Sequence, residues 1–201
     1  MYSYSYGYGD LGEHMLKSFV MIYLVCLMGV LIVAVGAYVL KSYGLYKIAE
    51  KKGMENAWAA WIPFVRTYYQ GELAGEIEIG RKKLKRPGIW MLLLPIAGNL
   101  LTAALVLFVI AAVVFAIVEN FVAGSFILSA ILPVFVIIFG IAGTAVSLGI
   151  MVAQHALKVF VNRRIYQGAT EDSMALFHAV AGLFVPGYEA VCIFYYSRKY
   201  E

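Results

Sequence analysis

The chain has 201 residues, of which 63% are hydrophobic and only 14% are charged, with a formal net charge of +4. Soluble domains carry about 25% charged residues, so this composition argues against an ordinary water-soluble domain. Two cysteines and three histidines, without Cys-x-x-Cys spacing, give no indication of a zinc module or a disulfide framework, and we expect no metal and no cofactor.

Residues 1–17 are predicted to form a flexible arm rich in tyrosine, glycine and serine. Tyr2, Tyr4, Tyr6 and Tyr8 alternate with serine or glycine, a composition with too little volume to build a core. A cleaved signal peptide is not favoured, because the apolar run that follows is longer than the roughly 7–15 residues typical of such peptides. Residues 18–201 are predicted to be one membrane-embedded helical domain, since no long polar linker divides them.

Three segments are long enough to cross a hydrocarbon core of about 30 Å, which requires roughly 20 apolar residues in a helix. They are residues 18–40, 89–118 and 121–153. Only Glu119 and Asn120 separate the second from the third, so we expect these two spans to form a tight antiparallel hairpin.

Two further segments, 42–76 and 155–197, are amphipathic and interrupted by proline. In the first, a lysine-rich helix is followed by an apolar and aromatic helix that is expected to stop at Pro63. In the second, the interruption falls at Pro186. We expect both segments to lie in the membrane interface or to be re-entrant.

The main ambiguity concerns residues 174–197, which are apolar enough to form a fourth crossing. They also contain Glu189 and the Pro186-Gly187 pair, and a charge near the middle of a bilayer is costly. The predicted fold class is therefore an all-α integral membrane protein with three transmembrane helices plus two proline-broken amphipathic or re-entrant helical segments. The alternative is four transmembrane helices.

The distribution of lysine and arginine predicts the orientation, because these residues accumulate on the cytoplasmic side of membranes. Of the 16, ten lie in residues 41–88 and five follow residue 155, whereas Lys17 alone lies on the opposite side of the first span. The sequence thus predicts a multi-pass protein with its N-terminus outside and its C-terminus in the cytoplasm.

A lysine-rich helix at 43–52, then Gly53, then the segment Trp58-x-x-Trp61-Ile62-Pro63, form a recognisable pattern. This pattern resembles an uncharacterised family of small bacterial polytopic membrane proteins. The resemblance implies location in the bacterial cytoplasmic (plasma) membrane. It implies no activity and assigns no functional residues.

Aromatic and basic residues around the first two spans are candidates for anchoring to membrane lipids. Trp58 and Trp61 are three residues apart and share one side of a helix, as in an interfacial aromatic belt. Cations beside the headgroups attract anionic lipid, which would outcompete nucleic acid there. The predicted interface residues are Trp58, Trp61, Tyr68, Tyr69, Arg81, Lys82, Lys83, Lys85, Arg86 and Trp90. They serve either as anchors and topology signals or as a pocket for a lipid headgroup or partner.

Small residues recur in the third span at the spacing that lets helix backbones approach closely. They are Gly140, Gly143, Thr144 and Ser147. Packing within the chain is the favoured interpretation. The alternative is an association face for a homo-oligomer.

Ionisable residues near apolar segments are functional candidates, and here they are His155, His178 and Glu189. The three residues could meet if the proline-broken segments pack together. However, no nucleophile stands at a recognised spacing, and pairing of Glu189 with a cation such as Arg164 or Arg198 is favoured. We therefore predict no catalytic site.

The sequence favours a non-enzymatic accessory, scaffold or regulatory membrane subunit, because it offers large interfacial surfaces and no recognisable chemistry. Expected partners are anionic membrane lipids and either a second copy or another membrane protein. The first alternative is a small oligomeric transporter or channel whose broken helices line a site. The second is an intramembrane lipid-modifying enzyme.

Overall fold

The computed structural model describes residues 8–122 and 126–200. Within these residues it is an all-α structure with six α-helices, one short 3-10 helix and one two-stranded hairpin. Three helices are long and apolar enough to cross a membrane, over Gly12–Lys51, Pro87–Glu119 and Ile131–Tyr166. The predicted fold class, with three candidate spans, is confirmed.

Helix α1 (Tyr8–Lys51) carries the first span and continues without interruption through the lysine-rich segment. It starts inside the predicted flexible arm, of which residues 1–7 lie outside the described residues. The helix ends where Gly53 adopts a φ of +65°. The N–H groups of Gly53 and Met54 bond the carbonyls of Glu50 and Ala49 at 3.1 and 3.0 Å, which satisfies the last turn.

The chain then forms the 3-10 helix η1 (Ala57–Trp61) and helix α2 (Pro63–Ala74). Pro63 therefore begins a helix in addition to following one, because proline fits the first helical position, where its missing N–H needs no partner. Gly71 of α2 lies directly against the backbone of Gly88, so a side chain at position 71 would overlap the neighbouring helix. This close approach seats α2 on the start of the second span.

A short β-hairpin precedes the second span and was not predicted from the sequence. Strand β1 (Ile77–Ile79) pairs antiparallel with β2 (Lys82–Leu84), and Gly80 makes the turn with a φ of +61°. Three-residue strands carry too few residues for a period-two pattern to be recognised. The basic cluster at 81–86 thus lies largely on this hairpin, and Lys83 pairs with Glu78 at 3.0 Å.

Helices α3 (Pro87–Val122) and α4 (Phe126–Tyr166) form the predicted antiparallel hairpin. The predicted turn at Glu119 and Asn120 was wrong, because α3 continues through both residues to Val122. The ring centroids of Phe108 and Phe139 lie 6.0 Å apart across the hairpin. Near its base, Gln154 Nε2 donates to the Leu94 carbonyl at 2.9 Å, so an interhelical hydrogen bond ties the two spans together.

The last apolar segment is broken in two. Helix α5 (Asp172–Phe184) ends before Pro186, and α6 (Tyr188–Lys199) begins after Gly187, whose φ is +80°. Helices of 13 and 12 residues are about 20 Å long, too short for a hydrocarbon core of about 30 Å. Residues 174–197 therefore do not form the alternative fourth transmembrane helix.

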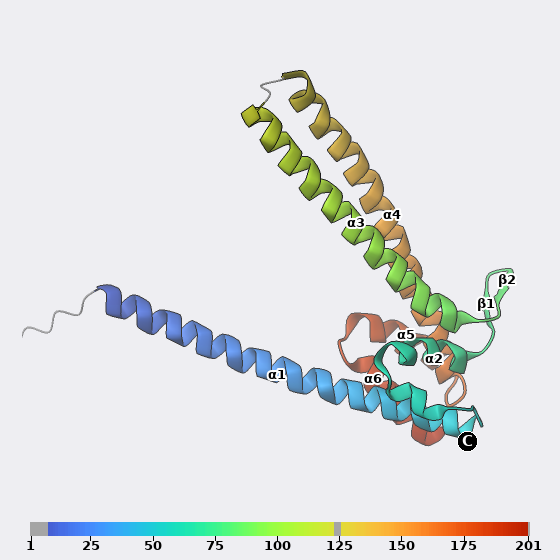
Figure 1. The fold of residues 1–201 in the computed structure, drawn as a ribbon. Coiled ribbons are helices and arrows are strands. Elements are labelled where there is room, and N and C mark those ends of the chain that lie inside the picture. The colour runs from blue at the N-terminus through green and yellow to red at the C-terminus, as the bar shows by residue number, and fades with distance from the viewer. Residues whose placement is uncertain (1–7, 123–125, 201) are drawn as a thin grey trace, which may run out of the picture.

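Figure 1 shows how these elements are arranged. We refer to one part of the structure as the junction domain. It comprises η1, α2, the β-hairpin, α5, α6 and the adjoining ends of α1, α3 and α4. Its core includes Leu45, Ile48, Val161, Ile165 and Ile193, all fully buried. From this domain α1 and the α3–α4 hairpin leave in different directions as two long arms. The lysines and arginines of residues 41–88 and 155–200 therefore lie together at one end of the spans.

Two glycines on different helices give opposite predictions. Gly71→Ala places a methyl group on the Gly88 backbone, which cannot yield as a side chain can, so we expect a loss of about 1–3 kcal/mol and a Tm lower by several degrees. Gly140→Ala, a control in α4 with open space around the added carbon, should leave Tm unchanged or raise it. Thermal unfolding in detergent measures both. Equal behaviour of the two variants would refute the α2–α3 contact.

Candidate functional site

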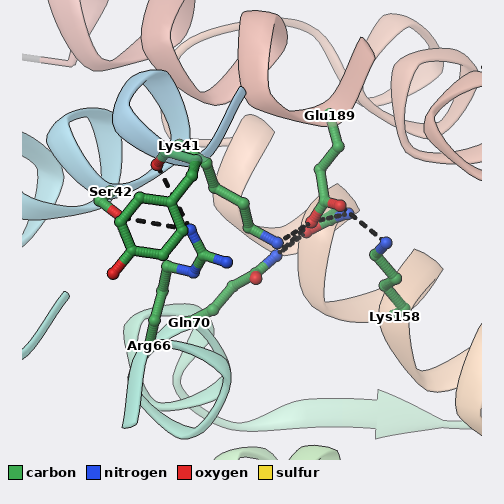
Figure 2. Close-up of polar contacts among 8 residues, drawn as sticks. Lys41, Ser42, Arg66, Gln70, Lys158 and Glu189 are labelled. Carbon is green, nitrogen blue, oxygen red and sulfur yellow. Dashed lines mark hydrogen bonds and ion pairs between the residues drawn. The ribbon is translucent and has the colours of Figure 1, made fainter. Parts of the chain in front are cut away.

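The carboxylate of Glu189 is the centre of a polar cluster inside the junction domain (Figure 2). Its Oε1 accepts hydrogen bonds from Lys41 Nζ at 2.9 Å and Gln70 Nε2 at 2.8 Å. Asn162 Nδ2 lies 3.2 Å from the same oxygen, and Lys158 Nζ pairs with Oε2 at 2.7 Å. Because these side chains come from α1, α2 and α4, one carboxylate on α6 joins four helices. We call these five residues the Glu189 cluster.

The local sequence explains why these groups meet. Lys158 and Asn162 are four residues apart, which places them on one face of α4. Lys41 is the first charged residue after the apolar run of α1. Glu189 lies in the first turn of α6, where the unpaired N–H groups of the helix favour a negative charge.

Every amide in the cluster is buried and bonded. Gln70 and Asn162 are each only 1% exposed, and Gln70 Nε2 donates to Asn162 Oδ1 at 2.5 Å in addition to its bond with the carboxylate. A buried polar network stabilises a fold when its members satisfy one another, and this one meets that condition around the carboxylate.

Two opposing effects act on the Glu189 carboxyl. Burial by itself raises its pKa, because the charged form loses water. The charges and hydrogen bonds of Lys41 and Lys158 outweigh burial and hold the pKa below the ordinary glutamate value. Glu189 is therefore a carboxylate at neutral pH, bonded on both oxygens, and it is poorly suited to accept a proton from a substrate.

Arg66 of α2 lies beside the cluster. Its Nη1 donates to the Tyr38 carbonyl at 3.3 Å and to Ser42 Oγ at 3.2 Å, and the guanidinium lies 4.4 Å from the centre of the Tyr38 ring. In the described part of the chain, Arg66 forms no ion pair with a carboxylate. Its position depends on a ring and two oxygen acceptors of α1.

Two cavities share Lys41 and Lys158 as lining residues. The interface cavity, of about 440 Å³, is lined by α1 between Ala34 and Lys41, by Arg66 and by the turn that joins α5 to α6. The second cavity, of about 250 Å³, opens between α2 and the bases of α3 and α4, where Trp90 and Gln154 contribute.

The predicted catalytic candidates do not assemble. His155 Nδ1 contacts the Met151 carbonyl of its own helix at 2.8 Å, and His178 Nδ1 lies 2.6 Å from the Tyr188 hydroxyl. Neither histidine hydrogen-bonds Glu189 in the structure described here. The expected pairing of Glu189 with a cation is confirmed, but Lys41 and Lys158 take its two oxygens in place of Arg164 or Arg198, because helix packing brings these two lysines to the carboxylate.

The predicted interface residues divide into exposed and buried groups. Trp58, Trp61 and Trp90 are 60%, 39% and 48% exposed, as an interfacial belt requires, and the basic residues Arg81, Lys82, Lys83, Lys85 and Arg86 are exposed as well. Tyr69 is buried, and its hydroxyl donates to the Glu55 carbonyl at 3.1 Å. Tyr69 therefore belongs to the core and not to the belt, whereas Tyr68 is half-buried.

The small residues of α4 are used unevenly. A side chain at Gly143 would overlap Leu105 of α3, so this glycine serves packing within the hairpin. Thr144 Oγ1 bonds the carbonyl of Gly140 in its own helix at 2.7 Å, and nothing lies near an added carbon at Gly140. Ser147 is half-buried. Packing within the chain accounts for Gly143, and self-association through this face stays a prediction.

Sequence reasoning found Glu189 but missed its partners. The four-residue spacing of Lys158 and Asn162 was a usable signal, because a cation and an amide on one helix face suit a carboxylate. Nothing in the sequence indicated that Gln70 or Lys41 would reach the same oxygen, since these contacts join residues 119 and 148 positions apart.

Comparisons with known proteins add no assignment. No family model matches the chain, and neither a curated protein nor a solved structure matches it significantly. In the described residues, no group of three or more histidine, cysteine, aspartate or glutamate side chains could hold a metal ion. The fold is therefore interpreted from its own geometry, as a possible multi-span membrane protein.

Removing the central charge should weaken the junction domain. Glu189→Gln keeps the size of the side chain but leaves two partly buried lysines without a counter-charge, so we expect a loss of up to about 3 kcal/mol, or roughly 6–12 °C in Tm. Glu78→Gln is the matched control, since its pair with Lys83 is exposed and its Tm should stay within error. Thermal unfolding in detergent compares the two variants. If Glu189→Gln were as stable as the control, the cluster would have no structural role.

Proposed function

We propose that this protein is a non-enzymatic accessory subunit that docks onto another membrane protein through the span of α1. Its junction domain would hold that span at a defined position beside the membrane surface. The proposal rests above all on the contrast between α1 and the α3–α4 hairpin.

The span of α1 has almost no contact with the other residues that the structure describes. Every large apolar side chain that is described in residues 15–35 is at least 50% exposed. The α3 and α4 spans, by comparison, pack on each other through Phe108 and Phe139 and through Leu105 and Gly143. A firmly anchored span without a helical neighbour is available to a partner helix.

Small residues on α1 support a helical partner. Gly29 and Gly36 are seven residues apart, so they lie on nearly the same face, and nothing lies within 4 Å of an added carbon at either. Since lipid tails are as apolar as leucine, helices in membranes associate through close packing at such small residues. The partner would approach α1 along this face.

The alternatives from the sequence gain less support. The enzyme hypothesis needed a free histidine–carboxylate pair, and the Glu189 carboxylate is instead bonded by two lysines and two amides. The transporter hypothesis needed broken helices that line a path through the membrane. The breaks at Pro63 and Pro186 lie in the junction domain, at one end of the spans.

For the location, we propose the plasma membrane of a bacterium, with the junction domain in the cytoplasm and the N-terminus outside. The gathering of lysine and arginine in the junction domain supports this orientation through the positive-inside tendency. The family resemblance supports the bacterial membrane.

The docking proposal is tested by a double variant of α1. Gly29→Leu with Gly36→Leu should abolish the stable complex isolated from native membranes in nanodiscs, because two bulky side chains keep a partner helix at a distance. Gly140→Leu with Gly149→Leu is the matched control, as both glycines in α4 also have open space around them. Native mass spectrometry gives the composition of each complex. The proposal would be refuted if the wild-type chain were isolated without a partner protein, or if the double variant of α1 kept its partner.

The orientation is tested by labelling. Lys82→Cys places a thiol on the exposed hairpin, in a background where Cys26 is replaced by alanine and Cys192 is buried. A membrane-impermeant maleimide should label this thiol only in inverted vesicles, and a protease should remove an N-terminal tag from intact cells. Labelling of the hairpin on intact cells would reverse the assignment.

A further inference from the structure

The interface cavity has an excess of positive charge. Lys41, Arg66 and Lys158 line it together with one carboxylate, that of Glu189, which gives a formal balance of two positive charges. The two lysines share this carboxylate, and Arg66 has no acidic partner in the described residues. Charges that are partly withdrawn from water require a counter-ion, so the cavity is suited to an anion.

Hydrogen-bond donors remain available for that anion. A guanidinium carries five N–H groups, and both bonds of Arg66 start from Nη1, so the donors on Nε and Nη2 are left for an external acceptor. Each lysine ammonium has three donors. A planar guanidinium with adjacent ammonium groups is the donor set that recognises phosphate oxygens.

The cavity also has apolar lining residues. Ala34 and Ala37 of α1, and Leu183 and Val185 beside the turn between α5 and α6, line it. Ala34 precedes Lys41 by seven residues, which is about 10 Å along a helix. Because Lys41 marks the end of the apolar run, the cavity extends from the level of the headgroups toward the hydrocarbon.

We propose that the interface cavity binds an anionic phospholipid, with Arg66, Lys41 and Lys158 around its phosphate and with its acyl chain against Ala34 and Ala37. A volume of about 440 Å³ lies within the range of small-molecule sites. This site is separate from the exposed basic cluster at 81–86, none of whose residues lines the cavity. A bound lipid would fill the angle between α1 and the junction domain.

The position of Glu189 is compatible with this ligand. Its carboxylate also lines the cavity, but Lys41 and Lys158 bond its two oxygens and offset its charge. The phosphate therefore meets Arg66 and the outward donors of the lysines. A phosphodiester carries one negative charge, which the remaining positive balance can accommodate.

Lipid binding to the full chain tests the proposal. The chain is delipidated in detergent and titrated with phosphatidylglycerol or phosphatidylcholine, and native mass spectrometry measures the bound fraction. Wild type should bind phosphatidylglycerol more tightly than phosphatidylcholine. Arg66→Gln should weaken phosphatidylglycerol binding about tenfold, the effect of one lost charge-assisted hydrogen bond, whereas the exposed control Arg198→Gln, outside the cavity lining, should change it less than twofold, about the effect expected of a surface charge.

A second pair of variants leaves the charges in place. Ala34→Leu fills the apolar end of the cavity from an exposed position on α1 and should also weaken phosphatidylglycerol binding, whereas Ala145→Leu, an exposed alanine in α4, should not. Glycerophosphoglycerol, which is phosphatidylglycerol without its acyl chains, supplies the same phosphodiester and should compete poorly. Equal effects of Arg66→Gln and Arg198→Gln, an unchanged affinity in Ala34→Leu, or efficient competition by glycerophosphoglycerol would each overturn the assignment to a lipid. Should Arg66→Gln fail to fold, Ala34→Leu and the competition decide alone.

Discussion

The shared carboxylate of Glu189 is the interaction on which the architecture depends. Two ammonium groups and two amides from three helices converge on it, and none of these partners is near it in sequence. Breaking such partly buried pairs costs up to about 3 kcal/mol, a large part of the roughly 5–15 kcal/mol that stabilises a typical domain. The relative placement of α1, α2, α4 and α6 therefore depends on a charge that only their joint burial brings into position.

Hydrocarbon and water impose different requirements on the two parts of the molecule. The arms expose large apolar side chains along most of their length, which is stable only in lipid or against another helix. The junction domain has a conventional buried core and holds nearly all of the cations. The Glu189 cluster lies where these parts meet, so a buried polar network lies close to the apolar spans.

The sequence was most informative where a single physical effect dominates. Apolar length alone predicted the three spans, and the energetic penalty of placing Glu189 in a bilayer predicted the break at Pro186 and Gly187. It was less informative where local and tertiary effects compete. The turn at Glu119 and Asn120 was placed too early because polar residues at a membrane surface can remain helical. The β-hairpin, the burial of Tyr69 and the partners of Glu189 depend on contacts between distant segments, which no local pattern encodes.

The continuity of α1 has a mechanical consequence. The helix contains no proline and runs for 44 residues, about 66 Å, from Tyr8 to Lys51, and Lys41 lies three quarters of the way along it. Because the helix is continuous, a tilt of its outer part also displaces the ammonium group of Lys41. A rotation of α1 about its axis by one residue, about 100°, would carry that group away from the Glu189 carboxylate. Any force applied to the first span inside the bilayer thus acts on the ion pair between Lys41 and Glu189, which helps to hold the helices of the junction domain together.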